Sequence, residues 1–217
     1  MNLRKLCLKL TILLMSFSLF FVTVEAQANG TECRENECFS QAEVQLKGEL
    51  RKLWIDHTIW TRNYIVSAIA GMEDQEKVLE RLLKNQEDIG NAIKPYYGDS
   101  AGNKLTELLR DHILIAGKLV AAAKSGDQAN VEKYNTEWYK NADDIVQFLS
   151  SANPNWTNAA LQDLLYTHLK MVTDDVMARI KKDWDASIIA FDQGEDHIIV
   201  LADALTEGIV KQFPDKF

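Results

Sequence analysis

Apolar residues recur at intervals of three and four along nearly the whole chain from Gln41 onward, and no stretch alternates apolar and polar residues as a strand does. Turn-forming residues divide this pattern into six stretches. The odd-numbered stretches end at Gly71, at Ser125-Gly126-Asp127 and at Lys182-Asp183, and the even-numbered ones end shortly before Pro95, Pro154 and Pro214. The pattern predicts helices over residues 41–70, 75–94, 102–125, 128–151, 158–182 and 184–213. We therefore expect an all-α, up-down antiparallel bundle of about six helices, forming one domain over residues 41–217.

The stretches resemble one another at a spacing of about 55 residues. Three histidines, His57, His112 and His168, each follow a leucine seven residues earlier and another four residues earlier. On the intervening stretches, Asn85 and Asn141 are 56 residues apart, and a further step of 56 reaches His197. The sequence therefore predicts three repeated helical hairpins. The alternative is that heptad-like patterning makes unrelated helices look alike.

Polar side chains interrupt the apolar stripes of this pattern at one height. His112 stands in the middle of a stripe that is otherwise formed by leucine and isoleucine, from Leu105 to Leu119. A helix rises about 1.5 Å per residue, so groups equally far from a hairpin turn lie at the same level. These polar residues lie 14 or 15 residues from their predicted turns, so we expect one polar layer inside the bundle. It is formed by His57, His112, His168 and His197 together with Asn85 and Asn141.

Three kinds of function fit such a layer. In the first, the four histidines bind zinc, copper, nickel or iron, Asp88 and Asp144 orient the imidazoles, and a small-ligand pocket is lined by Trp60, Tyr64 and Trp138. In the second, the imidazoles hydrogen-bond to the asparagines or to these aspartates and only fix helix register, as a buried asparagine does in a coiled coil. In the third, the imidazoles act as acid–base groups of a hydrolase, with Asp88 and Asp144 behind them.

The sequence lacks the motifs that several kinds of catalytic or metal site require. A ferritin-like di-metal centre needs Glu-x-x-His, and none of the four histidines has a glutamate three residues earlier. Haem ligation stays open, although no Cys-x-x-Cys-His attachment motif occurs. Neither a phosphate-binding glycine loop nor a Gly-x-Ser-x-Gly elbow is found, so nothing specifies a nucleophile. These absences favour a binding protein over an enzyme.

The N-terminal region predicts export. Basic residues precede a 15-residue apolar run that ends at Val24, and small residues follow, so residues 1–28 are expected to be a signal peptide. The run is short for a membrane span, which needs about 20 residues, so we expect no stable span after cleavage; a retained anchor is the alternative. In residues 29–40, Cys33 and Cys38 are expected to form a disulfide, since export leaves them in an oxidising environment. We expect a secreted or cell-envelope protein.

Charge narrows the range of partners. The chain of 217 residues has a formal net charge of −8. Without the predicted signal peptide, 21 basic residues face 31 acidic ones. Such an acidic surface argues against nucleic acid as a partner. A metal, a small ligand or a cell-surface protein remain as expected partners.

Four blocks carry a resemblance to a known family: "RLLKNQEDIGNAIKPYYG", "LLRDHILIAGKLVAAAKSGD", "WYKNADDIVQFLSSANP" and "QFPDKF". Over roughly Leu50 to Phe217 the chain resembles an uncharacterised family of secreted all-helical proteins of bacteria and some archaea. Some similar sequences are labelled acetylglutamate kinase. Such kinases are α/β proteins with glycine-rich phosphate loops, and this sequence has no such loop and no strand pattern. The resemblance implies export and helicity and assigns no functional residue.

Overall fold

The computed structural model describes residues 39–217, and these residues form helices and no strand. The α-helices are α1 (Gln41–Ala70), α2 (Gln75–Ser125), α3 (Gln128–Ala152), α4 (Asn158–Ile180) and α5 (Trp184–Gln212), and a short 3-10 helix, η1 (Pro214–Lys216), follows. The all-α class is therefore confirmed. The predicted signal peptide and the predicted Cys33–Cys38 disulfide lie outside the described residues.

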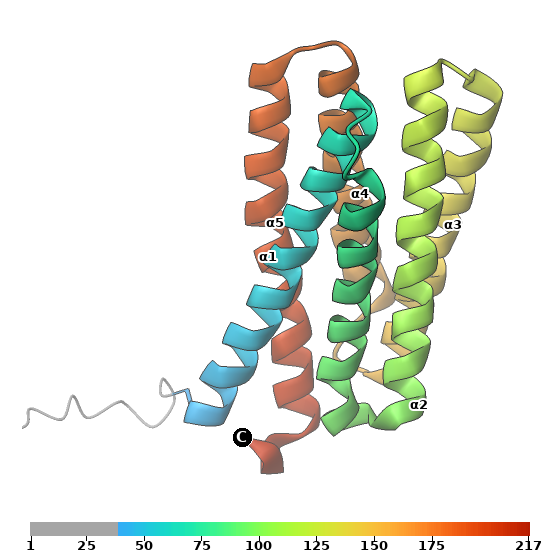
Figure 1. The fold of residues 1–217 in the computed structure, drawn as a ribbon. Coiled ribbons are helices and arrows are strands. Elements are labelled where there is room, and N and C mark those ends of the chain that lie inside the picture. The colour runs from blue at the N-terminus through green and yellow to red at the C-terminus, as the bar shows by residue number, and fades with distance from the viewer. Residues whose placement is uncertain (1–38) are drawn as a thin grey trace, which may run out of the picture. The chain divides into compact units, whose positions relative to one another are not determined.

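The structure has five α-helices where the pattern predicts six. Residues 75–125 are counted as one helix, α2, although α2 consists of two helical arms that meet at Gly98. The chain reverses inside α2 at Gly98, whose φ of 80° and ψ of 169° are open to glycine but strained for other residues. The two arms of α2, residues 75–97 and 99–125, consequently run antiparallel and are joined at the lower end of the bundle in Figure 1.

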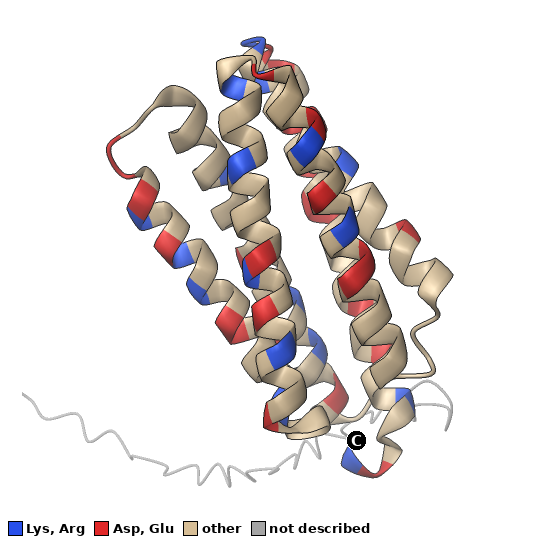
Figure 2. Cartoon of the chain, turned by 90° about the vertical axis from the view of Figure 1, so that its right-hand side faces the viewer, with Lys and Arg blue, Asp and Glu red and all other residues tan. Residues whose placement is uncertain are grey.

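The helices pack around a ring in the order of the sequence. α1 packs on α2, α2 on α3, α3 on α4 and α4 on α5, and α5 closes the ring by packing on α1. Side-chain caps start four of the helices: Ser40, Asp127, Thr157 and Asp183 each accept a hydrogen bond from the backbone N–H three residues later. Within residues 39–217, no helix has both the length and the apolar character needed to cross a membrane. Along the helices, acidic and basic residues are interspersed (Figure 2).

The two arms of α2 approach each other closely at a pair of glycines, Gly90 and Gly102. A Cβ atom on Gly102 would lie 2.6 Å from the carbonyl oxygen of Gly90 and 2.4 Å from Cγ of Lys94. A Cβ atom on Gly90 would lie 2.5 Å from the carbonyl oxygen of Gly102. The lysine side chain can move away but the facing backbone cannot, so both positions need glycine for the arms to pack.

Substituting Gly102→Ala is therefore expected to lower the free energy of unfolding by about 1–3 kcal/mol, as overpacking does in other cores. The matched control is Gly48→Ala on α1, where a Cβ would meet nothing within 4 Å. That change should stabilise the protein by up to about 1 kcal/mol, because alanine favours a helix over glycine. Urea unfolding followed by circular dichroism measures both. Equal effects of the two substitutions would contradict the close approach of the arms.

The buried apolar side chains form two clusters that are stacked along the bundle. The large cluster occupies the half near Gly98 and includes Trp54, Leu109 and Leu165. The small cluster occupies the half near Gly71 and Gly126, and its buried members are Tyr64, Ile65, Ala68, Leu82, Ile113, Val120 and Val176. On α1 the change from one cluster to the other falls between Trp54 and Tyr64, which is where His57 lies.

Candidate functional site

Three histidines are buried at the boundary between the two clusters. His57 is 2% exposed, and His112 and His168 are each 5% exposed. The rings of His57 and His168 come from α1 and α4, and their centroids are 5.5 Å apart. His197, on α5, is only partly buried. The structure thus brings the predicted histidines together, with one of them at the edge of the layer.

One hydrogen bond recurs in all three predicted hairpins. Asn85 Nδ2 donates to the carbonyl oxygen of Leu53 over 3.0 Å, and Asn141 Nδ2 donates to that of Leu108 over 3.1 Å. His197 Nε2 lies 2.8 Å from the carbonyl oxygen of Leu164 and donates to it, since a carbonyl can only accept.

Each accepting carbonyl belongs to the leucine four residues before a layer histidine, that is, before His57, His112 or His168. In an α-helix this carbonyl already accepts a hydrogen bond from the backbone N–H of the histidine. The side chain from the neighbouring helix therefore donates to the second lone pair of the carbonyl oxygen. The bond therefore ties each pair of helices together at one height.

In the second hairpin, the imidazole is bonded to the same asparagine. Nδ1 of His112 lies 2.7 Å from Oδ1 of Asn141. Because the amide nitrogen of Asn141 is used by Leu108, its oxygen is the acceptor and the proton of His112 is on Nδ1. The Trp138 ring packs on this imidazole, with 5.2 Å between ring centroids. Trp138 therefore lies beside the layer, as predicted from the sequence, and it is buried.

In the first hairpin, His57 is bonded to Gln86, which the sequence pattern did not single out. Nδ1 of His57 lies 3.3 Å from Nε2 of Gln86, and the same amide nitrogen lies 3.2 Å from Oδ1 of Asn85. An amide nitrogen donates, so Nδ1 of His57 is the acceptor. The sequence does indicate that Gln86 is buried, because it interrupts an apolar stripe of Leu82, Ile89 and Ile93, as His112 interrupts the stripe from Leu105 to Leu119.

His168 is the layer histidine without a direct partner. Its Nδ1 is buried and has no hydrogen bond within the described part of the chain, and the same holds for Oγ1 of Thr61. Both residues line a cavity of about 20 Å³. Such a volume accommodates about one water molecule and is far below the roughly 300–1,000 Å³ of typical ligand pockets.

Burial keeps the layer imidazoles neutral. Removal from water lowers the pKa of His57 to about 3, and the neighbouring His112 contributes to this lowering. Burial also lowers the pKa of His112 to about 4. For His168, burial and the proximity of the other three histidines hold the pKa well below its usual 6.5. At neutral pH these three rings are uncharged.

Four side chains predicted to support the layer lie elsewhere. Asp88 and Asp144 point to solvent and pair with Lys84 and Lys140, at 3.3 Å and 3.0 Å, because they lie on the outer faces of their helices. They do not stand behind the imidazoles. Trp60 is half-buried under the guanidinium of Arg81, and Tyr64 belongs to the small cluster. The cavity of about 80 Å³ that Trp138 lines includes neither of them.

The layer does not gather a conventional set of metal ligands. Over residues 39–217, no group of three or more His, Cys, Asp or Glu side chains is arranged to hold a metal ion. The aspartates expected beside the histidines are at the surface, and the Nδ1 atoms of two histidines are taken by amides.

A second polar cluster lies one turn away from the layer, around Arg62. The arginine follows the half-buried Trp60 by two residues on α1, yet its own side chain is only 15% exposed. Its Nη1 atom forms an ion pair with Asp175 and a 2.7 Å hydrogen bond to Oγ of Ser187. The guanidinium also lies over the Phe191 ring, 5.4 Å from its centroid. This cluster joins α1, α4 and α5, and Arg179 lies beside it with its Nη1 3.4 Å from Oγ of Ser187.

No family model, curated protein or solved structure matches this chain.

Proposed function

We propose that this protein is an exported interaction or structural module of the cell surface or the medium, in which the buried histidine layer fixes helix register. The observation that carries this proposal is the hydrogen bond repeated in each hairpin, from Asn85, Asn141 and His197 to a leucine carbonyl. These donors are committed to the bundle itself, so they are not available to a ligand. Export is supported by the pattern of residues 1–28 and by the resemblance to secreted helical proteins.

The internal cavities support a role for the surface rather than the core. The cavity beside His168 and the one inside the large cluster each measure about 20 Å³, and the one between α2, α3 and α4 measures about 80 Å³. All three are too small for an ordinary organic ligand. By contrast, Trp184, Ile188 and Ile189 at the start of α5 are more than half exposed, as is typical of contact surfaces.

The repeated hydrogen bond also supports the proposal that the bundle consists of three equivalent hairpins. The two arms of α2 would then belong to different hairpins, with the first arm paired to α1 and the second to α3. The three bonds join residues separated by 32, 33 and 33 positions. Helices that merely share a heptad-like pattern have no reason to repeat a side-chain bond to the equivalent carbonyl.

Metal binding is the second candidate, and one observation favours it. His57 and His168 have ring centroids 5.5 Å apart, close to the roughly 5 Å expected when two imidazoles bind one tetrahedral metal at about 2.0–2.1 Å. His168 also has a free Nδ1. Against it stands the lack of a third ligating side chain among the described residues.

Elemental analysis separates these two functions. The protein is recovered after export, purified without a histidine tag, exposed to zinc, copper, nickel and iron salts, and desalted. A His57→Ala, His112→Ala double variant is treated in parallel. We expect no stoichiometric metal in either protein, and a lower thermal midpoint for the variant because its layer is broken. Near-stoichiometric metal that disappears in the variant would overturn the register-only role and establish the metal site.

A further inference from the structure

A groove runs along the outside of the second hairpin, between the second arm of α2 and α3. Its volume is about 330 Å³, and Asn141, the layer asparagine, is among its lining residues. The lining also includes Asp111, Leu114, Ile115, Lys118 and Glu137. The volume falls within the range of sites that hold a small ligand or a large side chain.

The first hairpin shows what fills the equivalent position. One repeat before Ile115 stands Trp60, and one repeat before Glu137 stands Arg81. There the guanidinium of Arg81 lies 5.0 Å from the centroid of the Trp60 ring, and its Nη2 is 3.9 Å from Asp56, the counterpart of Asp111. In the second hairpin, isoleucine replaces the indole and glutamate replaces the guanidinium. The groove therefore has the shape and charge left when an aromatic ring and its covering cation are removed.

The charges of the groove favour a cation. Asp111 and Glu137 form no ion pair with any described residue. Two lysines line the groove as well. Lys140 is paired with Asp144, which also lines it, and Lys118 lies over the Tyr134 ring, 5.8 Å from its centroid. The unpaired carboxylates of the groove therefore favour a basic partner.

This chain itself carries a matching group at the turn between α4 and α5. Trp184 is 53% exposed, and the guanidinium of Arg179 lies 5.4 Å from the centroid of its ring. Lys181 and Lys182 are exposed beside it, so three basic residues outnumber Asp183 and Asp185 at this tip. Trp184 and Arg179 thus form the same kind of guanidinium–indole contact as Trp60 and Arg81.

We propose that the groove binds the Trp184 tip of a second copy of this chain. The indole occupies the place over Ile115, and the basic residues of the tip face Asp111 and Glu137. This inference rests on the proposed interaction role and names its partner. Such a contact combines a buried aromatic anchor with charge complementarity, which is the usual composition of an interface hot spot.

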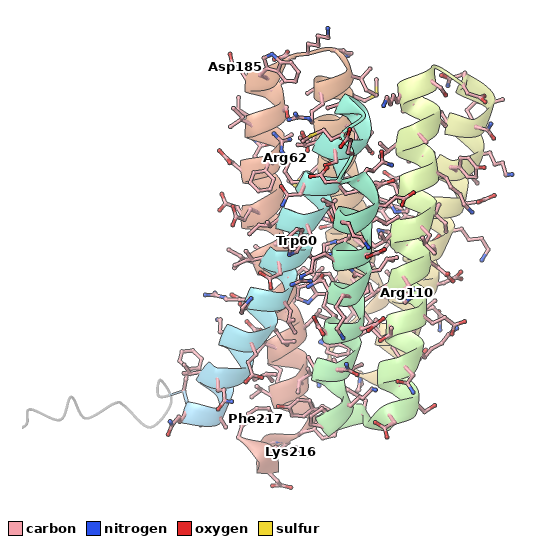
Figure 3. All side chains as sticks on the ribbon, in the orientation of Figure 1. Trp60, Arg62, Arg110, Asp185, Lys216 and Phe217 are labelled. Atoms are coloured by element: carbon pink, nitrogen blue, oxygen red, sulfur yellow. The ribbon has the colours of Figure 1, made fainter. Side chains whose placement is uncertain are left out.

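The two surfaces lie on different sides of the bundle, so one chain cannot fill its own groove. Asp185, in the tip, lies at the upper end of α5 in Figure 3, whereas Arg110, next to Asp111, lies on the opposite side of the bundle. The contact uses two different surfaces, so copies add head to side and form rings or open chains. A contact of this small size is expected to be weak and to depend on protein concentration and salt.

Sedimentation equilibrium on the exported protein tests the proposal up to about 1 mM, the range in which weak contacts are populated. Trp184→Ala removes the anchor, and Ile115→Trp fills the groove as Trp60 does. Each change is expected to weaken association at least about tenfold, as loss of a hot-spot tryptophan typically does. Val200→Ala, a change at another exposed apolar residue, should leave association unchanged.

Mixing the two variants tests the geometry of the contact. The Trp184→Ala variant keeps its groove and the Ile115→Trp variant keeps its tip, so an equimolar mixture offers one usable tip and one usable groove. The mixture should therefore form a dimer and nothing larger. Each variant alone should stay monomeric at the same concentration.

Wild-type protein that stays monomeric over this range would overturn the proposal. So would a Val200→Ala variant whose association is weakened as much as that of Trp184→Ala, or mixed variants that do not dimerise. None of these substitutions replaces a residue of the histidine layer. If the protein is metal-free but does not associate, only the proposal that a second copy is the partner is rejected. If the protein binds stoichiometric metal, the register-only role of the histidine layer is rejected, and the sedimentation result is judged independently of it.

Discussion

Lowering the pH from 6.5 to 5 is expected to reduce the free energy of unfolding by about 5 kcal/mol. In the folded protein, burial lowers the pKa of His57 to about 3 and that of His112 to about 4, and it holds the pKa of His168 well below 6.5. In the unfolded chain all three titrate near 6.5, so the unfolded state takes up protons that the folded state does not.

The sign and size of the change in unfolding free energy follow from this difference in proton binding between the folded and unfolded states. Well above pH 6.5 the imidazoles are neutral in both the folded and the unfolded state, and the stability is complete. As the pH falls toward 5, the loss of stability approaches about 1.4 kcal/mol per pH unit for each histidine. For His112 the loss levels off near pH 4, which is close to its folded pKa. Three histidines together approach about 4 kcal/mol per pH unit, so a fall of one to two units removes much of the roughly 5–15 kcal/mol by which a typical domain is stable. Urea unfolding at a series of pH values, followed by tryptophan fluorescence, measures the slope.

The variant His112→Gln isolates the contribution of the imidazoles from that of surface carboxylates. It removes one of three buried titrating groups, so the slope of unfolding free energy against pH between about 6 and 5 should fall by about a third. Wild-type and variant slopes that coincide would show that His112 is not held neutral by burial, and the assignment of the layer as a neutral core would be wrong.

Replacing Asn141 by leucine is expected to destabilise the protein by about 3 kcal/mol. The change removes the 3.1 Å bond to the carbonyl of Leu108 and the 2.7 Å bond to His112. It also leaves the Nδ1–H of His112 buried without a partner, which typically costs about 1–3 kcal/mol in addition to the lost bonds. Guanidinium unfolding at about pH 8, where the imidazoles are neutral, gives the value.

A double variant tests whether the asparagine and histidine act as a pair. His112→Leu together with Asn141→Leu removes both partners, and the Leu108 carbonyl keeps its helical hydrogen bond. The double variant should therefore be at least about 1 kcal/mol more stable than the sum of the two single effects predicts. Asn91→Leu, at an exposed position of α2, serves as the control and should change stability by less than about 0.5 kcal/mol. Additive effects at positions 112 and 141 would contradict the pairing.

The helices, the turns between them and the height of the polar layer could be predicted from the sequence. Apolar spacing and turn residues place helix ends to within a few residues, since Gly71 and Gly126 end α1 and α2 in the left-handed conformation that the turn prediction requires. The level of His57, His112 and His168 could be counted because the helical rise is constant. The break predicted between residues 94 and 102 lies at Gly98, because Pro95 and the two residues after it continue the first arm of α2.

The partners of the layer could not be read in the same way. Asp88 and Asn85 are three residues apart on one helix, yet Asn85 reaches the carbonyl of Leu53 while Asp88 pairs with Lys84 in solvent. Which of two such neighbours faces inward depends on how far the helix is rotated about its axis. Arg62 shows the same limit, because its burial depends on Asp175, which is 113 residues away.

The sequence by itself therefore determined helicity, the turns and the spacing of polar groups along each helix, because these depend on backbone geometry and on residues a few positions apart. Only the tertiary structure decided which hydrogen bonds the histidines make, that Gln86 joins them, and that a groove remains where Ile115 stands in place of a tryptophan. These features depend on the rotation and contact of helices that are distant in sequence, and that arrangement is set only when the whole ring of helices closes and packs.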